Sequence, residues 1–123
     1  MDLSDNTLSN LSALYLKEAI ARPGAKNLTR LSLANNVNLT SQAGIFIGDA
    51  LKENVDHPIE KVSFKGVDLG DEGLVRILEA CNENKNIKKV NLGIVTSRGL
   101  GLIAKSLALN KSLIKIKFQE NET

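Results

Sequence analysis

Four basic residues recur at nearly regular intervals along the chain and are the first candidates for chemistry. Arg30, Lys61, Lys89 and Lys115 are 31, 28 and 26 residues apart, and each stands directly before an apolar–x–apolar pair. Cationic side chains of this kind bind carboxylates or phosphates through charge-assisted hydrogen bonds. The chemistry expected of the pattern is therefore the binding of an anionic partner.

The other chemically capable residues are isolated or have an ordinary structural role. His57 is the only histidine and has a single acid and no cysteine near it at a ligand spacing, so we expect a loop histidine. Cys81 falls on an apolar helix face and is expected to be a small core residue. Three acids, Asp68, Asp71 and Glu72, lie near the expected start of a helix. Acidic side chains there usually interact favourably with the helix dipole, and calcium binding is the alternative. The sequence thus predicts no catalytic residue, no metal site and no cofactor.

Composition sets the class of protein. The 123 residues suit one domain, and a hydrophobic fraction of 42% is enough for a core. The single cysteine favours a reducing compartment, and the net charge of +2 gives little support to nucleic-acid binding. No run of about 18 apolar residues occurs, and the polar N-terminus does not resemble a signal peptide. We expect a cytoplasmic protein that is not bound to a membrane.

A repeated motif indicates which elements position the basic residues. Residues 28–36 read LTRLSLANN, which has the form LxxLxLxxN, and the second apolar residue of the pair recurs at positions 3, 33, 64, 92 and 118. A repeat of about 20–29 residues with this form is the leucine-rich-repeat signature. The motif predicts strands near 31–33 and over 59–64, 87–92 and 113–118. Helices are expected over 9–21, 41–53 and 71–82, with another beginning at 97.

Apolar residues at helical spacing predict which helix face meets the core. They are Leu11, Leu14, Ala19 and Ile20 in the first helix; Ala43, Ile47, Ala50 and Leu51 in the second; Leu74, Ile77, Leu78 and Cys81 in the third; and Leu100, Ile103, Ala104 and Leu107 in the last. We expect Ser9, Asp71 and Ser97 to cap helices. Gly44 and Gly48 are expected to let the helix and strand layers approach closely.

One asparagine follows the first complete motif and predicts a particular bend. The amide of Asn36 can satisfy backbone groups that the bend after the strand would otherwise bury unpaired. Asn121 holds the same position at the end of the chain, whereas Val67 and Val95 replace it in between. Less regular bends are expected at the two valines.

Taken together, these motifs resemble a known family. Residues 84–87 (NKNI) and 110–113 (NKSL) lead into strands, and a GxxxI pattern lies in the helices at 73–77 and 99–103. The chain is similar over essentially its whole length to the ribonuclease-inhibitor-like class of leucine-rich repeats. The resemblance implies an α/β fold, a right-handed solenoid or horseshoe with a parallel sheet on the concave face and helices on the convex face. The NKSL motif is also similar to the repeats of tropomodulin and of the capping-protein regulators, which bind actin-filament machinery.

Alternation along the strands predicts the binding surface. Side chains of a strand point alternately to opposite faces, so the residues beside the inward apolar pair line the concave face. This face becomes basic toward its C-terminal half, and we predict that it binds a partner through Arg30, Lys61, Lys65, Lys89, Asn91, Lys115 and Lys117. The alternative is a solvated face on which lysines only prevent aggregation.

The sequence therefore favours a non-catalytic protein–protein interaction module, with an actin-regulatory role as one form of it. The expected partner is a protein with an acidic surface; nucleic acid is disfavoured because no aromatic residue interrupts the basic column. One alternative is a regulator of an enzyme, such as a GTPase-activating array with Arg30 or Arg98 as its inserted arginine. The other is a structural segment that stacks on further repeats or on a second copy. In either case residues 1–123 are expected to form a single leucine-rich-repeat domain of about four repeats, a fragment of a longer array.

Overall fold

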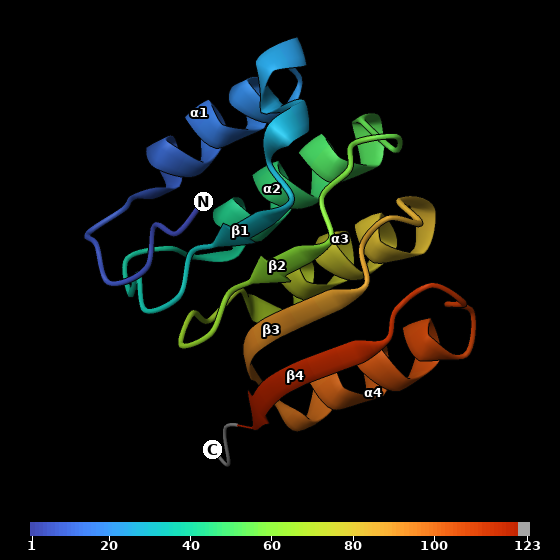
Figure 1. Ribbon diagram of the computed structural model, residues 1–123. Coiled ribbons are helices and arrows are strands. Elements are labelled where there is room, and N and C mark those ends of the chain that lie inside the picture. The colour runs from blue at the N-terminus through green and yellow to red at the C-terminus, as the bar shows by residue number, and fades with distance from the viewer. Residues whose placement is uncertain (121–123) are drawn as a thin grey trace.

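The computed structural model describes residues 1–120 and has an α/β fold with one parallel sheet (Figure 1). The four strands are β1 (Arg30–Ser32), β2 (Lys61–Ser63), β3 (Lys89–Val95) and β4 (Lys115–Glu120), and they lie side by side in chain order. Every neighbouring pair is parallel. The expected strands are confirmed in place, although β1 begins one residue earlier, β2 is shorter, and β3 and β4 begin and end later than the motif predicts.

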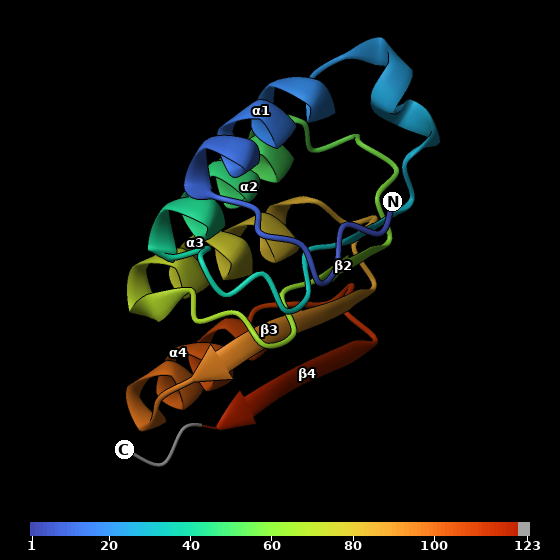
Figure 2. The same cartoon turned by 90° about the vertical axis from the view of Figure 1, so that its left-hand side faces the viewer.

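One helix follows each of the first three strands, and a further helix precedes the sheet. The helices are α1 (Asn10–Ile20), α2 (Ser41–Glu53), α3 (Gly70–Glu83) and α4 (Ser97–Leu107), with a short 3-10 helix η1 (Pro23–Asn27) after α1. Figure 2 shows the helices on one side of the sheet, which leaves the opposite side open. We call that uncovered side the open sheet face.

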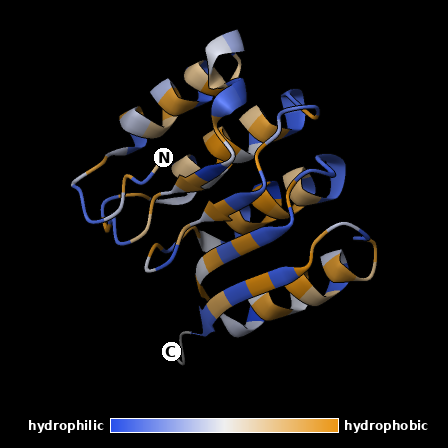
Figure 3. Cartoon of the chain, viewed as in Figure 1, coloured by the Kyte–Doolittle hydropathy of each residue, from blue (hydrophilic) through white to orange (hydrophobic). Residues whose placement is uncertain are grey.

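The core lies between the sheet and the helices. The strands, with the residues that directly follow β1 and β2, contribute Leu31, Leu33, Val62, Phe64, Val90 and Leu92, all 3% exposed or less. Residues between them point to the open sheet face, so hydrophilic and hydrophobic bands alternate along β3 and β4 in Figure 3. This alternation is what brings the basic residues to one surface.

Two glycines set the distance between α2 and α3. A Cβ atom on Gly44 would lie 2.7 Å from the Cα of Gly73, and one on Gly48 would lie 2.7 Å from the carbonyl oxygen of Arg76. Only a residue without a side chain fits such backbone contact. The prediction that these glycines bring the helix and strand layers together is wrong, because they bring one helix against another.

The bend after β1 is organised by Asn36, as predicted. This fully buried residue donates from Nδ2 to the carbonyl oxygens of Leu3 (2.9 Å) and Leu33 (3.0 Å) and accepts from the backbone N–H of Leu8 (3.2 Å). At the equivalent positions Val67 and Val95 are buried apolar residues. The prediction for Asn121 lies outside the described residues.

Several predictions for the outermost helices are wrong. Leu11 is 55% exposed and Leu107 is 45% exposed, while Ala19 and Ala104 are exposed as well. In residues 1–120, α1 packs against one neighbouring helix, α2, and α4 against one, α3, so each buries a narrower face than α2 or α3. Periodicity identifies an apolar face but does not tell how much of it meets a neighbour.

Two of the predicted caps are also displaced. α3 begins at Gly70, so Asp71 lies within its first turn and not at the cap. In α4 the cap is Thr96, whose Oγ1 accepts from the N–H of Gly99 (3.1 Å), and Ser97 is the first helical residue. Ser9 is the N-cap of α1, as predicted.

Candidate functional site

The C-terminal half of the open sheet face holds a hollow of about 200 Å³ that we call the lysine groove. It is lined by Lys61, Ser63, Lys65, Lys89, Val90, Asn91, Lys115 and Lys117. Six of the seven residues predicted to bind a partner are in this set. The sequence thus predicts most of the groove, because alternation along the strand determines which side chains reach it.

Strand register brings the lysines together. Lys61 pairs with Lys89 across β2 and β3, and Lys89 pairs with Lys115 across β3 and β4. Neighbouring strands lie about 4.8 Å apart, so three ammonium groups extend from adjacent positions on one face. Two residues along the strand, Asn91 pairs with Lys117 in the same way.

The two uncharged polar residues of the groove use their acceptor atoms locally. Ser63 Oγ accepts from the N–H of Lys65 (3.3 Å), and Asn91 Oδ1 accepts from the N–H of Gly93 (3.0 Å). The hydroxyl hydrogen of Ser63 and the Nδ2 group of Asn91 make no hydrogen bond to another residue of the 1–120 segment. Both are therefore left as donors, like the lysines around them.

The N-terminal half of the open sheet face has mixed charge. Arg30 pairs with Lys61 in the sheet register and borders a second hollow of about 410 Å³, which includes Asp2 and Ser32 and shares Lys61, Ser63 and Lys65 with the lysine groove. Asp2 forms a bridge beside Ser32, and its pKa is lowered by hydrogen bonds from the side chain and backbone of Ser4. Arg30, the seventh predicted residue, is thus outside the lysine groove, and the hollow that it borders also contains Asp2.

His57 is a functional candidate that sequence reasoning treated as an ordinary loop residue. It does lie in the loop between α2 and β2, but it is only 6% exposed. Its Nδ1 accepts from the backbone N–H of Ile59 (3.1 Å), and its Nε2 is buried without a hydrogen-bond partner in residues 1–120. Burial lowers the pKa of His57, and the nearby carbonyl of Ala25 in η1 partly opposes that shift. Nothing in the sequence around His57 indicates this burial, because η1, which lies near its side chain, is about 30 residues away along the chain.

The remaining candidates have local roles. Cys81 is buried, as predicted, and burial raises the pKa of its thiol to about 12. Arg98 lies 3.6 Å from Asp71, measured from Nε to Oδ2. Asp68 accepts from the N–H of Gly70 (3.0 Å), and the described residues contain no group of three or more His, Cys, Asp or Glu placed to hold a metal ion.

Comparison with known proteins gives no family assignment. No protein-family model matches the chain. A search of curated proteins finds no match either.

Among residues 1–120, no helix combines the length and apolar character needed to cross a membrane.

Proposed function

We propose that the chain is a right-handed leucine-rich-repeat solenoid and a non-catalytic, cytoplasmic module that binds a protein partner through its concave face. In this reading the open sheet face is the concave one. The repeat architecture is supported by parallel strands that follow one another in chain order with one helix between them. The hydrogen bonds of Asn36 in the bend after β1 give it further support.

The observation that carries the binding function is the unbalanced charge of the lysine groove. Five lysines line it, no carboxylate does, and none of the ion pairs within residues 1–120 involves these lysines. Like charges opposed on neighbouring strands cost roughly 0.2–1 kcal/mol per pair, so a complementary acidic partner would relieve a standing repulsion. Charges of this kind mainly raise the rate of association and select the partner.

The first partner to test is actin, because the NKSL motif at 110–113 is similar to the repeats of actin-filament regulators. Binding to monomeric and filamentous actin is measured at 50 and 200 mM salt for the wild type and for Lys89→Glu/Lys115→Glu. We expect the variant to bind at least tenfold more weakly and to show a flatter salt dependence. The control is Lys26→Glu/Lys105→Glu, which makes the same charge change on η1 and α4. Equal loss in both variants would contradict a role for the groove.

A structural role is a second candidate, favoured by apolar side chains at the α4 and β4 end of the sheet. Leu109 is 72% exposed, Ile114 is 76% exposed and Phe118 is 42% exposed. Further repeats or a second copy would cover them. Light scattering over a concentration series tests this role, since a dimer that Leu109→Lys/Ile114→Lys abolishes would support it.

Enzyme regulation is the third candidate, and Arg30 suits it better than Arg98. Arg30 is exposed on the open sheet face, whereas the guanidinium of Arg98 faces Asp71 on a helix. Loss of stimulation of a bound GTPase in Arg30→Ala, with binding retained, would identify this activity.

A further inference from the structure

The lysine groove presents hydrogen-bond donors from every polar side chain that lines it. Five ammonium groups come from lysines, and Ser63 and Asn91 add a hydroxyl and an amide donor while their oxygens accept from Lys65 and Gly93. A groove in which every polar side chain offers a donor, and the five lysines can only donate, is complementary to a group that only accepts. Ionised carboxylates and phosphoryl groups have that property.

The kind of cation is compatible with either anion. The planar fork of arginine matches carboxylates and phosphates alike with two parallel hydrogen bonds, whereas lysine approaches either group as a compact point charge. Every cation of the groove is a lysine, and the one arginine of the open sheet face, Arg30, lies outside it.

The amount of charge favours a phosphoryl group over a carboxylate. Lys61, Lys89 and Lys115 occupy adjacent register positions, and Lys117 extends from the next outward position on β4. A phosphorylated residue carries a charge of about −1.5 to −2 and three acceptor oxygens, so one such group can engage several of these lysines together. A single carboxylate has one charge and two oxygens. Binding it would therefore leave much of the repulsion among the lysines in place.

The surroundings of the groove favour a phosphate carried on a peptide. A second hollow of about 450 Å³ shares Lys65, Asn91 and Lys117 with the groove and continues over Gly93, Phe118 and Gln119. Its mixture of backbone, apolar and amide surface suits a chain on either side of a phosphorylated residue. No aromatic side chain lines the lysine groove itself, as base stacking would require.

We propose that the lysine groove binds a phosphoryl group on a phosphorylated segment of the partner protein. The phosphate lies among Lys89, Lys115 and Lys117 and accepts from Nδ2 of Asn91, while the flanking chain follows β3 and β4. The inference rests on the proposed function, in which this face binds a protein, and specifies the chemistry that it recognises.

The test uses three fluorescent pools of degenerate twelve-residue peptides with phosphoserine, glutamate or serine at the central position. Binding to the full chain is followed by anisotropy. We expect the phosphoserine pool to bind at least tenfold more tightly than the glutamate pool, and the serine pool to bind most weakly. Lys89→Gln/Lys115→Gln should weaken phosphoserine binding at least tenfold, whereas the control Lys26→Gln/Lys105→Gln should not change it.

A second variant separates ligand binding from folding. Asn91→Asp keeps an oxygen to accept from the N–H of Gly93 but replaces the donor Nδ2 with a charged acceptor. It should reduce phosphoserine binding at least tenfold, with the circular dichroism spectrum and melting temperature retained. Unchanged binding in a folded Asn91→Asp protein would overturn the placement of the phosphate.

The remaining outcomes distinguish this inference from the proposed function. Equal binding of the glutamate and phosphoserine pools would overturn phosphoryl recognition and leave an acidic-protein site intact. Binding of inorganic phosphate alone, or of vesicles containing a phosphoinositide in preference to every peptide pool, would overturn the peptide source. If no pool binds while an acidic protein still binds through Lys89 and Lys115, the inference fails and the proposed function stands.

Discussion

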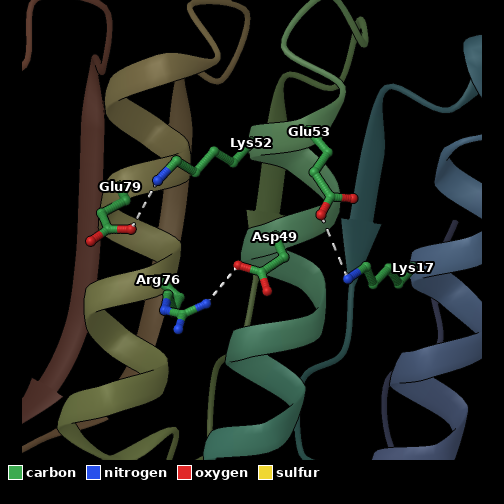
Figure 4. Close-up of polar contacts among 6 residues, drawn as sticks. All are labelled: Lys17, Asp49, Lys52, Glu53, Arg76 and Glu79. Carbon is green, nitrogen blue, oxygen red and sulfur yellow. Dashed lines mark hydrogen bonds and ion pairs between the residues drawn. The ribbon is translucent and has the colours of Figure 1, made fainter.

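The helix layer and the open sheet face arrange their charges in opposite ways. Neighbouring helices carry opposite charges at facing positions, and Figure 4 shows three ion pairs that join α1 to α2 and α2 to α3. They are Lys17 with Glu53 (3.8 Å), Arg76 with Asp49 (2.8 Å) and Lys52 with Glu79 (3.4 Å). On the open sheet face, strand register instead places Lys61, Lys89 and Lys115 beside one another.

This difference shows that a repeated succession of strand and helix does not by itself decide which charges become neighbours. On the helix side, opposite charges face one another. On the open sheet face, three lysines of like charge are neighbours. Exposed ion pairs contribute only about 0–1 kcal/mol each, so the helix layer gains little stability from its pairs. The contrast is informative because neighbouring helices pair their charges with one another, whereas none of the ion pairs within residues 1–120 involves the lysines of the groove.

The largest expected loss of stability comes from forcing α2 and α3 apart, which would disrupt the helix layer that carries the ion pairs. Gly44→Val would place a Cβ atom 2.7 Å from the Cα of Gly73, a contact that no side-chain rotation relieves. We expect the free energy of unfolding to fall by about 3 kcal/mol, or the protein to fail to fold, because overpacking forces the backbone to move. Urea unfolding followed by circular dichroism measures the loss.

The matched control is Gly101→Ala in α4, where a Cβ atom would meet nothing within 4 Å. Alanine in an exposed helix position should raise the free energy of unfolding by up to about 1 kcal/mol. A similar loss in both variants would mean that the effect at Gly44 is not due to close helix packing.

A smaller effect is expected from pH, acting through a buried group that belongs to neither charged surface. His57 lies where α2 leads into β2, and burial holds its pKa below the ordinary value of about 6.5. The unfolded chain therefore binds more protons than the folded chain between the lowered pKa and about pH 6.5. The contribution of neutral His57 to the free energy of unfolding is therefore complete above about pH 6.5. It is lost as the pH falls through the pKa that His57 has in the folded protein.

The comparison protein is His57→Asn, in which the Asn oxygen can still accept from the N–H of Ile59. Free energies of unfolding from pH 7.5 to 5 should fall more steeply for the wild type than for this variant. Parallel curves would show that His57 does not contribute to the pH dependence.

The sequence predicted the surfaces better than the ends and the loops, and the reasons are physical. Lys61, Lys89 and Lys115 could be assigned to one face because the strand period of two depends only on local geometry. The exposure of Leu11 could not be predicted, since it depends on which side of α1 has a neighbour. The burial of His57 depends on packing against η1, which is remote in sequence and leaves no periodic signal.

The smallest expected effects test the comparison directly, through variants of opposite sign. Asp49→Asn removes an attraction to Arg76 and should lower the free energy of unfolding by about 0.5 kcal/mol at 20 mM salt. Lys89→Gln removes the repulsion of Lys89 by its neighbours Lys61 and Lys115 and should raise the free energy of unfolding by a few tenths of a kcal/mol. In 1 M NaCl, where the screening length is about 3 Å, salt should remove most of the electrostatic part of both changes in the free energy of unfolding. Urea unfolding curves of the wild type and of each variant at the two salt concentrations measure these changes. If Lys89→Gln is instead destabilising at low salt and recovers in high salt, the lysines are already balanced within the chain, and the open sheet face carries no standing repulsion for a partner to relieve.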